Sequence, residues 1–66
     1  MAGNTRGKIK EHFEGIHRNH DWIEYHCDKC VALIDGRNKK LTDAIRAYHR
    51  EIKVLDKLTL ALYATI

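Results

Sequence analysis

Apolar residues return in steps of four and three along most of the chain, and this spacing restricts the fold more than any other feature of the sequence. The first series, in which only His20 is strongly polar, is Ile9, Phe13, Ile16, His20, Ile23, Cys27, Cys30 and Ile34. Such steps keep side chains on one stripe of an α-helix. The chain contains no proline to interrupt that helix. We therefore predict a helix over about residues 5–35, with Asn4 or Thr5 as its N-cap and residues 1–4 as a flexible N-terminus.

The spacing stops at the segment IDGRNKK and then resumes in a second series. Gly36 is suited to ending a helix because glycine takes the left-handed conformation at low cost. The second series is Leu41, Ile45, Tyr48, Ile52, Leu55, Thr59, Leu62 and Ile66. A short connection between two long helices gives an antiparallel pair. We expect an all-α fold with a single domain over residues 1–66, an antiparallel two-helix hairpin of about 5–35 and 38–65.

A hairpin of this size buries too little surface to be stable alone. Several apolar residues lie beside the two stripes and would face water in a monomer. The residues expected at an oligomer interface are Trp22, Val31, Ala47, Val54, Leu58 and Ala61. The expected assembly is a homodimeric four-helix bundle or a higher oligomer.

The pair Cys27-x-x-Cys30, with His26 beside it, has a spacing found in zinc and redox sites. Both cysteines lie on the predicted stripe, however, where a thiol packs as a small apolar group. His26 and His49 flank the stripe on opposite sides and do not converge on the thiols. We therefore interpret both cysteines as core residues and expect no metal and no cofactor. A four-thiolate zinc site shared between two copies and a redox role are the alternatives that the sequence leaves open.

Folding the chain back about residues 37 and 38 makes the numbers of facing residues add up to about 75, and we expect the two apolar stripes to pack against each other and close the hairpin. This register brings three histidines close to carboxylates: His17 to Asp56, His26 to Glu51, and His49 to Glu24. Weak ion pairs between the helices are the simpler interpretation, and a pH-sensitive assembly is the alternative. His20 faces Leu55 in this register and needs a polar partner, either its copy in another subunit or Asn19, unless it lines a ligand pocket.

Four cations of the second predicted helix form a stripe that points away from the apolar series. Arg46, Arg50, Lys53 and Lys57 fall at i, i+4, i+7 and i+11, and Lys39 and Lys40 extend the stripe into the turn. These six residues are the candidate ligand-binding residues, because arginine and lysine grip phosphate or carboxylate groups. A plainly solvated surface and a contact with the acidic residues of another copy are the other interpretations.

Catalysis is not expected. The chain has no serine, no glycine-rich phosphate loop and no HExxH motif, and no nucleophile stands beside a base. No stretch approaches the roughly 18 apolar residues of a membrane span, so we expect a cytoplasmic protein without a membrane partner.

The long first helix, the turn LIDGRNKKL at residues 33–41 and the C-terminal LTLALYATI resemble a family of small phage proteins. These helical-hairpin proteins, of the anti-CBASS and anti-Thoeris sponge type, sequester the nucleotide immune signals of the host. The resemblance implies an oligomer that encloses a cyclic nucleotide with arginine, lysine and aromatic side chains, in the host cytoplasm.

Together these features predict a non-enzymatic, oligomeric protein that binds an anionic ligand, first of all a small nucleotide. Two alternatives remain open. One is a protein-interaction or assembly module, such as a viral inhibitor of a host enzyme. The other is an RNA- or DNA-binding hairpin dimer, an architecture used in plasmid copy-number control. In each case the expected partners include a second copy of the chain.

Overall fold

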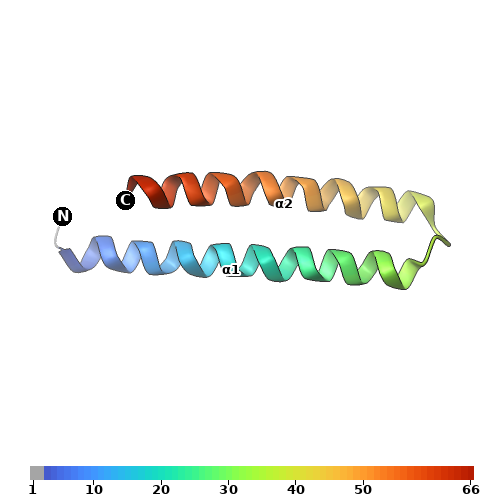
Figure 1. The fold of residues 1–66 in the computed structure, drawn as a ribbon, viewed down its shortest axis with the longest axis horizontal. Coiled ribbons are helices and arrows are strands. Elements are labelled where there is room, and N and C mark those ends of the chain that lie inside the picture. The colour runs from blue at the N-terminus through green and yellow to red at the C-terminus, as the bar shows by residue number, and fades with distance from the viewer. Residues whose placement is uncertain (1–2) are drawn as a thin grey trace.

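The computed structural model describes residues 3–66, which form two long helices lying side by side (Figure 1). Helix α1 spans Gly3–Ile34 and helix α2 spans Lys39–Thr65. The helices run antiparallel, so the beginning of α1 and the end of α2 lie at the same end of a rod of 54 × 16 × 11 Å (Figure 1). The prediction of an all-α two-helix hairpin is confirmed.

The turn between the helices is built by backbone conformation and by one arginine. Asp35 and Gly36 both have positive φ, 50° and 75°, and this left-handed conformation ends α1. The Arg37 side chain then turns back on the helix end: its Nη2 donates to the Leu33 carbonyl at 2.8 Å and its Nε to the Ile34 carbonyl at 3.1 Å. These bonds satisfy carbonyls that the last turn of a helix leaves free.

Asn38 starts α2. Its backbone is extended, and its side-chain Oδ1 accepts a hydrogen bond from the Leu41 N–H at 3.1 Å. The Asn38 carbonyl accepts the first bond of the helix from the Thr42 N–H at 3.0 Å. This is the geometry of an N-cap, and it fixes the direction in which the chain returns.

We expect Asn38→Ala to lower the free energy of unfolding by about 0.5–1 kcal/mol, because the first turn of α2 loses its capping acceptor. Urea denaturation followed by circular dichroism measures the change. Asn19→Ala is the matched control, since Asn19 is exposed and its side chain has no hydrogen bond within residues 5–66. An equal loss in both variants would contradict the role of the cap.

The beginning of α1 differs from the prediction. The helix begins at Gly3, so Asn4 and Thr5 lie inside it and neither is the N-cap. Of the four residues expected to be flexible, Gly3 and Asn4 are helical, and residues 1–2 lie outside the described part of the chain.

The surface along which α1 and α2 meet is narrow. Only Cys27, Ile52 and Thr59 are buried among residues 5–66, with 6–7% of each residue exposed. Half-buried residues continue this inner surface toward both ends, among them Phe13, Ile34, Ile45 and Ile66.

Half of the second predicted apolar stripe and two of the eight residues of the first are turned away from the partner helix. Six residues are exposed in this way: Ile16, Cys30, Leu41, Tyr48, Leu55 and Leu62. The exposed fraction of the five other than Cys30 lies between 40% and 55%. The prediction that they close the hairpin is wrong. The residues that follow four of them in the chain, Thr42, His49, Asp56 and Tyr63, are half-buried. Three of these, His49, Asp56 and Tyr63, form hydrogen bonds across to α1. The helices are therefore rotated about their axes so that these polar residues face the partner helix, and the apolar residues before them turn outward.

No helix in the described residues combines the length and the apolar character needed to cross a membrane.

Candidate functional site

Polar side chains link α1 and α2 along one side of the hairpin, which we call the polar edge. At its centre, Asp56 Oδ1 lies 2.7 Å from His17 Nδ1 and 3.1 Å from His20 Nδ1. The side chains of Asp56 and His20 are only 15% and 14% exposed. A carboxylate this enclosed needs donors, and the two imidazoles supply them.

The two sides of this contact shift each other's pKa. Burial alone would raise the pKa of Asp56, but the hydrogen bonds and the charges of His17 and His20 outweigh it and hold that pKa below 3.8. The hydrogen bond to Asp56 raises the pKa of His17 above 6.5, against the opposing effect of burial. The charged pair of imidazolium and carboxylate is therefore the favoured state near pH 5.

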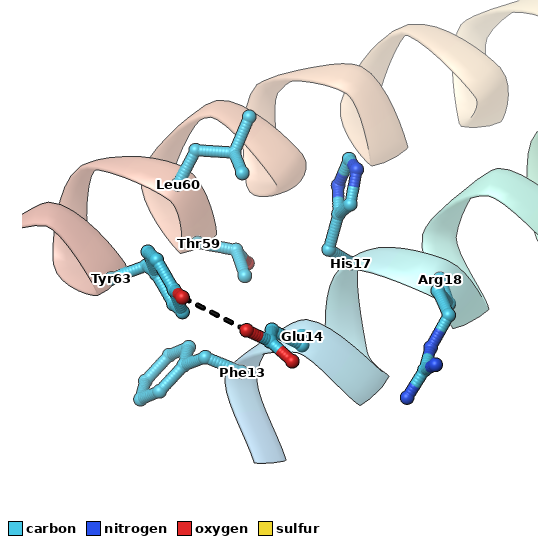
Figure 2. A pocket seen from close by; sticks show the side chains of 7 residues that line it. All are labelled: Phe13, Glu14, His17, Arg18, Thr59, Leu60 and Tyr63. Atoms are coloured by element: carbon cyan, nitrogen blue, oxygen red, sulfur yellow. Dashed lines mark hydrogen bonds between the residues drawn. The ribbon is translucent and has the colours of Figure 1, made fainter. Parts of the chain in front are cut away.

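Two further contacts extend the polar edge in both directions. His49 Nε2 lies 3.0 Å from Glu24 Oε1, and the Tyr63 hydroxyl donates to Glu14 Oε1 at 2.8 Å (Figure 2). The expected pairs His17–Asp56 and His49–Glu24 are thus confirmed, and with them the register of the hairpin.

The other two expectations for histidines are wrong. The partner of His20 is Asp56, rather than Asn19 or the same residue of another copy. His26, expected near Glu51, lies on an aromatic cluster of α1, with its ring 6.0 Å from the Trp22 ring and 5.4 Å from the Tyr25 ring. Stacking along one helix has replaced the expected pairing between helices.

One group at the polar edge has the composition of a metal site. Ligand atoms of His17, Asp21 and Asp56 lie within 4.8 Å of one another. An imidazole and two carboxylates suit divalent transition metals. The distances of 2.7 and 3.1 Å around Asp56 are hydrogen-bond lengths, however, and they already satisfy this carboxylate. The arrangement is therefore explained as an interhelical hydrogen-bond network.

The two cysteines have different surroundings. Cys27 is buried, as expected for a core residue, whereas Cys30 is exposed, so the prediction is wrong for Cys30. Burial is the main cause of a raised pKa at Cys27, and its thiol stays protonated at neutral pH. A protonated thiol is a poor nucleophile and a poor metal ligand.

The basic stripe of α2 is the strongest candidate for a binding surface. All six predicted residues, Lys39, Lys40, Arg46, Arg50, Lys53 and Lys57, are exposed. The carboxylate ion pairs found within residues 5–66 all involve histidines, so none of these cations is neutralised by a carboxylate within 4.0 Å. From Arg46 to Lys57 the stripe extends about 16 Å along the helix.

Two cavities lie away from the basic stripe. One of about 370 Å³ opens beside the polar edge and is lined by Phe13, Glu14, His17, Arg18, Thr59, Leu60 and Tyr63. In Figure 2, Glu14 points toward Tyr63, and Arg18 points away from both. The Glu14 carboxylate lines this cavity together with Arg18 and His17, so the cavity does not present the uniformly positive lining that an anionic ligand needs. A second cavity, of about 480 Å³, lies on α1 at Arg18, Asp21, Trp22 and Tyr25, and it also holds a carboxylate.

The residues expected at the oligomer interface are scattered over the surface. Trp22, Val54, Leu58 and Ala61 are exposed, whereas Val31 and Ala47 are half-buried. Val31 belongs to the side of α1 that faces α2, because it lies four residues after Cys27 on the same side of the helix.

No protein-family model, curated protein or solved structure matches this chain. The function proposed for the hairpin therefore rests on its own residues.

Proposed function

We propose that this hairpin is a non-enzymatic, homo-oligomeric binding protein that holds an extended polyanion, the backbone of a nucleic acid, along the basic stripe of α2. The observation that carries the proposal is the state of the stripe. Arg46, Arg50, Lys53 and Lys57 share one side of a helix, all are exposed, and no carboxylate neutralises them within residues 5–66.

The shape of the stripe favours an extended ligand. Compact ligands such as a cyclic nucleotide are held in concave sites that cover most of their surface. The stripe lies instead on the open side of a helix, and its residues line neither of the two cavities described above. An open row of cations is suited to following a phosphate backbone, where binding gains from the release of counterions. Nucleotide sequestration, which the sequence resemblance implies, would need a cage assembled from several copies.

The test is a charge reversal in the stripe. We expect Arg46→Glu combined with Arg50→Glu to weaken binding of a fluorescent single-stranded RNA at least about tenfold at low salt. On a single strand each lost phosphate contact lowers the slope of log affinity against log salt by about 0.7, so two lost contacts lower it by about 1.4. Fluorescence anisotropy over a salt series measures both quantities. The same assay with duplex DNA compares the two classes of nucleic acid.

The matched control is Lys8→Glu combined with Lys29→Glu, which changes the net charge equally on the exposed surface of α1. This control is expected to keep the wild-type salt slope to within about 1. An equal loss of affinity in both double variants would mean that the net charge of the protein, and not the position of the basic stripe, controls binding. Unchanged binding of the stripe variant would refute the proposal. Thermal stabilisation by a cyclic dinucleotide, without any binding of nucleic acid, would support sequestration of a nucleotide instead.

A further inference from the structure

The apolar residues that turn away from the inner surface gather on one side of the hairpin. We call this side the apolar face, and its central residues are Ile16, Ile23 and Cys30 of α1 with Tyr48, Leu55 and Leu62 of α2. None of the six carries a charge at neutral pH, and all are exposed except Ile23, which is half-buried. Soluble monomers rarely leave such a continuous apolar surface uncovered.

Helix geometry explains why the α1 residues and the α2 residues of the apolar face lie on the same side of the hairpin. Ile16 precedes His17 and Tyr48 precedes His49, and one residue back along a helix turns the side chain by about 100°. The helices are antiparallel, so these two rotations carry Ile16 and Tyr48 to the same side. A cavity of about 380 Å³ confirms it, because residues of both helices line it together, among them Ile23, Cys30, Ala44 and Tyr48.

We infer that the apolar face is a dimer interface, on which a second copy of this chain packs its own apolar face to form a twofold-symmetric four-helix bundle. The inference deepens the proposed function by naming the surface through which the homo-oligomer assembles, and it does not depend on the anion that the oligomer binds.

The direction of the apolar stripes fits a bundle. On each helix, the inner residues and the residues of the apolar face together form a stripe whose centre points about 50° away from the line joining α1 to α2. In a square bundle of four helices, the direction from one helix to the bundle centre lies about 45° from the direction to its neighbour. Half of each stripe therefore closes the hairpin, and the other half faces the position of a second hairpin.

The exposed area also fits a dimer. The hairpin exposes 5334 Å². A compact monomer of 7.7 kDa is expected to expose about 4300 Å². The excess of about 1000 Å² is close to the roughly 800 Å² that each partner of a stable complex covers.

Charge explains why a second copy suits this surface. The chain carries a net charge of +3, so two copies repel each other if their basic residues meet. Arg46 and Lys53 lie two residues before Tyr48 and Leu55, which places them about 160° around α2 from the apolar face. Two copies joined through this face keep their basic stripes on opposite outer sides. The six central residues of the face are uncharged, with Glu51 beside Tyr48 and Leu55 at its margin, and a twofold rotation matches the face to itself.

The test compares two neighbouring residues of α2. Leu55 lies on the apolar face and is 49% exposed, whereas Val54 lies on the outer side and is 51% exposed. Sedimentation equilibrium of the wild type is expected to give twice the chain mass of 7.7 kDa. Leu55→Glu is expected to weaken the dimer about 100-fold or more, because each partner then buries an unpaired carboxylate. Val54→Glu is expected to leave the dimer intact.

A second measurement uses the wild type alone, so it tests the inference even if Leu55→Glu fails to fold. The exposed Cys30 thiol lies on the apolar face, so we expect a thiol reagent to modify it slowly in concentrated protein and faster on dilution below the dimer dissociation constant. A helical wild-type monomer at high concentration would overturn the inference, and so would a dimer that Val54→Glu breaks and Leu55→Glu does not. A stable dimer that binds no nucleic acid would refute only the binding of nucleic acid. A helical monomer that binds nucleic acid would refute the dimer interface and the homo-oligomeric state, and would leave the binding role of the basic stripe intact.

Discussion

Ile52→Ala is expected to lower the free energy of unfolding by about 3 kcal/mol, the largest effect of a single truncation in this chain. Ile52 is only 6% exposed and lies at the middle of the inner surface. Truncating a buried isoleucine removes apolar contacts and leaves a cavity that two rigid helices cannot close. Urea denaturation followed by circular dichroism measures the loss. Protein concentration must be held constant, because folding and association are linked in an oligomer.

Val54→Ala is the matched control for this truncation. Val54 is a β-branched residue two positions later on α2, and about half of it is exposed. Its truncation is expected to cost less than about 1 kcal/mol, since water already covers much of the side chain. A similar loss in both variants would mean that the inner surface described here does not hold the helices together.

Asp56→Asn is expected to remove a pH-dependent part of the stability. The pKa of Asp56 is lowered in the hairpin, so its contribution is present above about pH 3.8 and is lost as the pH falls through the lowered pKa. The pKa of His17 is raised, so its contribution is present below about pH 6.5 and is lost as the pH rises through the raised pKa. The free energy of unfolding of the wild type should therefore exceed that of the variant by the largest amount between about pH 4 and pH 6.5.

We expect that excess to be about 1–2 kcal/mol, because the pair is partly exposed and water screens it. Urea denaturation across the pH range, for wild type and variant in parallel, gives the difference directly. Asp43→Asn is the control, since Asp43 is exposed and pairs with no residue of the described chain. A wild-type advantage that stays constant from pH 4 to pH 8 would show that the charged contact with His17 and His20 is not its origin.

The helices and their register could be predicted from the sequence because local signals fix them. The four-three spacing defines where each helix runs, and Gly36 marks the turn with a positive φ that few other residues tolerate. The register then follows from the turn, and the pairs His17–Asp56 and His49–Glu24 agree with it.

The rotation of the helices about their axes could not be predicted in the same way. The sequence shows where the middle of the apolar stripe of a helix lies. In a bundle that middle faces the centre of the bundle, and the nearest helix lies to one side of this direction. Seen from one chain, Leu55 is therefore the natural inner residue, yet Asp56 takes that position because two imidazoles bind its carboxylate. A signal was available: His49, Asp56 and Tyr63 follow one another at seven-residue intervals, as residues on one side of a packed helix do.

The position of the basic stripe on α2 could be predicted from the sequence, but not whether its cations are paired with carboxylates. Helical spacing alone puts Arg46 and Lys57 on one side of α2, whatever the rest of the fold does. Whether a cation is paired depends on residues brought near it by tertiary packing. Here Glu24 and Glu14 of α1 are engaged by His49 and Tyr63, and Asp56 of α2 is engaged by His17. The exposure of Cys30 likewise depended on helix rotation, so its spacing to Cys27 could not reveal it.

The beginning of α1 and the end of α2 lie at one end of the rod (Figure 1), and there the Arg6 side chain donates a hydrogen bond to the Ile66 carbonyl. Two hairpins can therefore be encoded in a single polypeptide, and the shortest tolerated linker would reveal how they are oriented. If the open ends of two hairpins meet, a few glycine residues suffice to join them. If they point in opposite directions, the linker must span the 54 Å length of the rod, which takes at least about 16 extended residues.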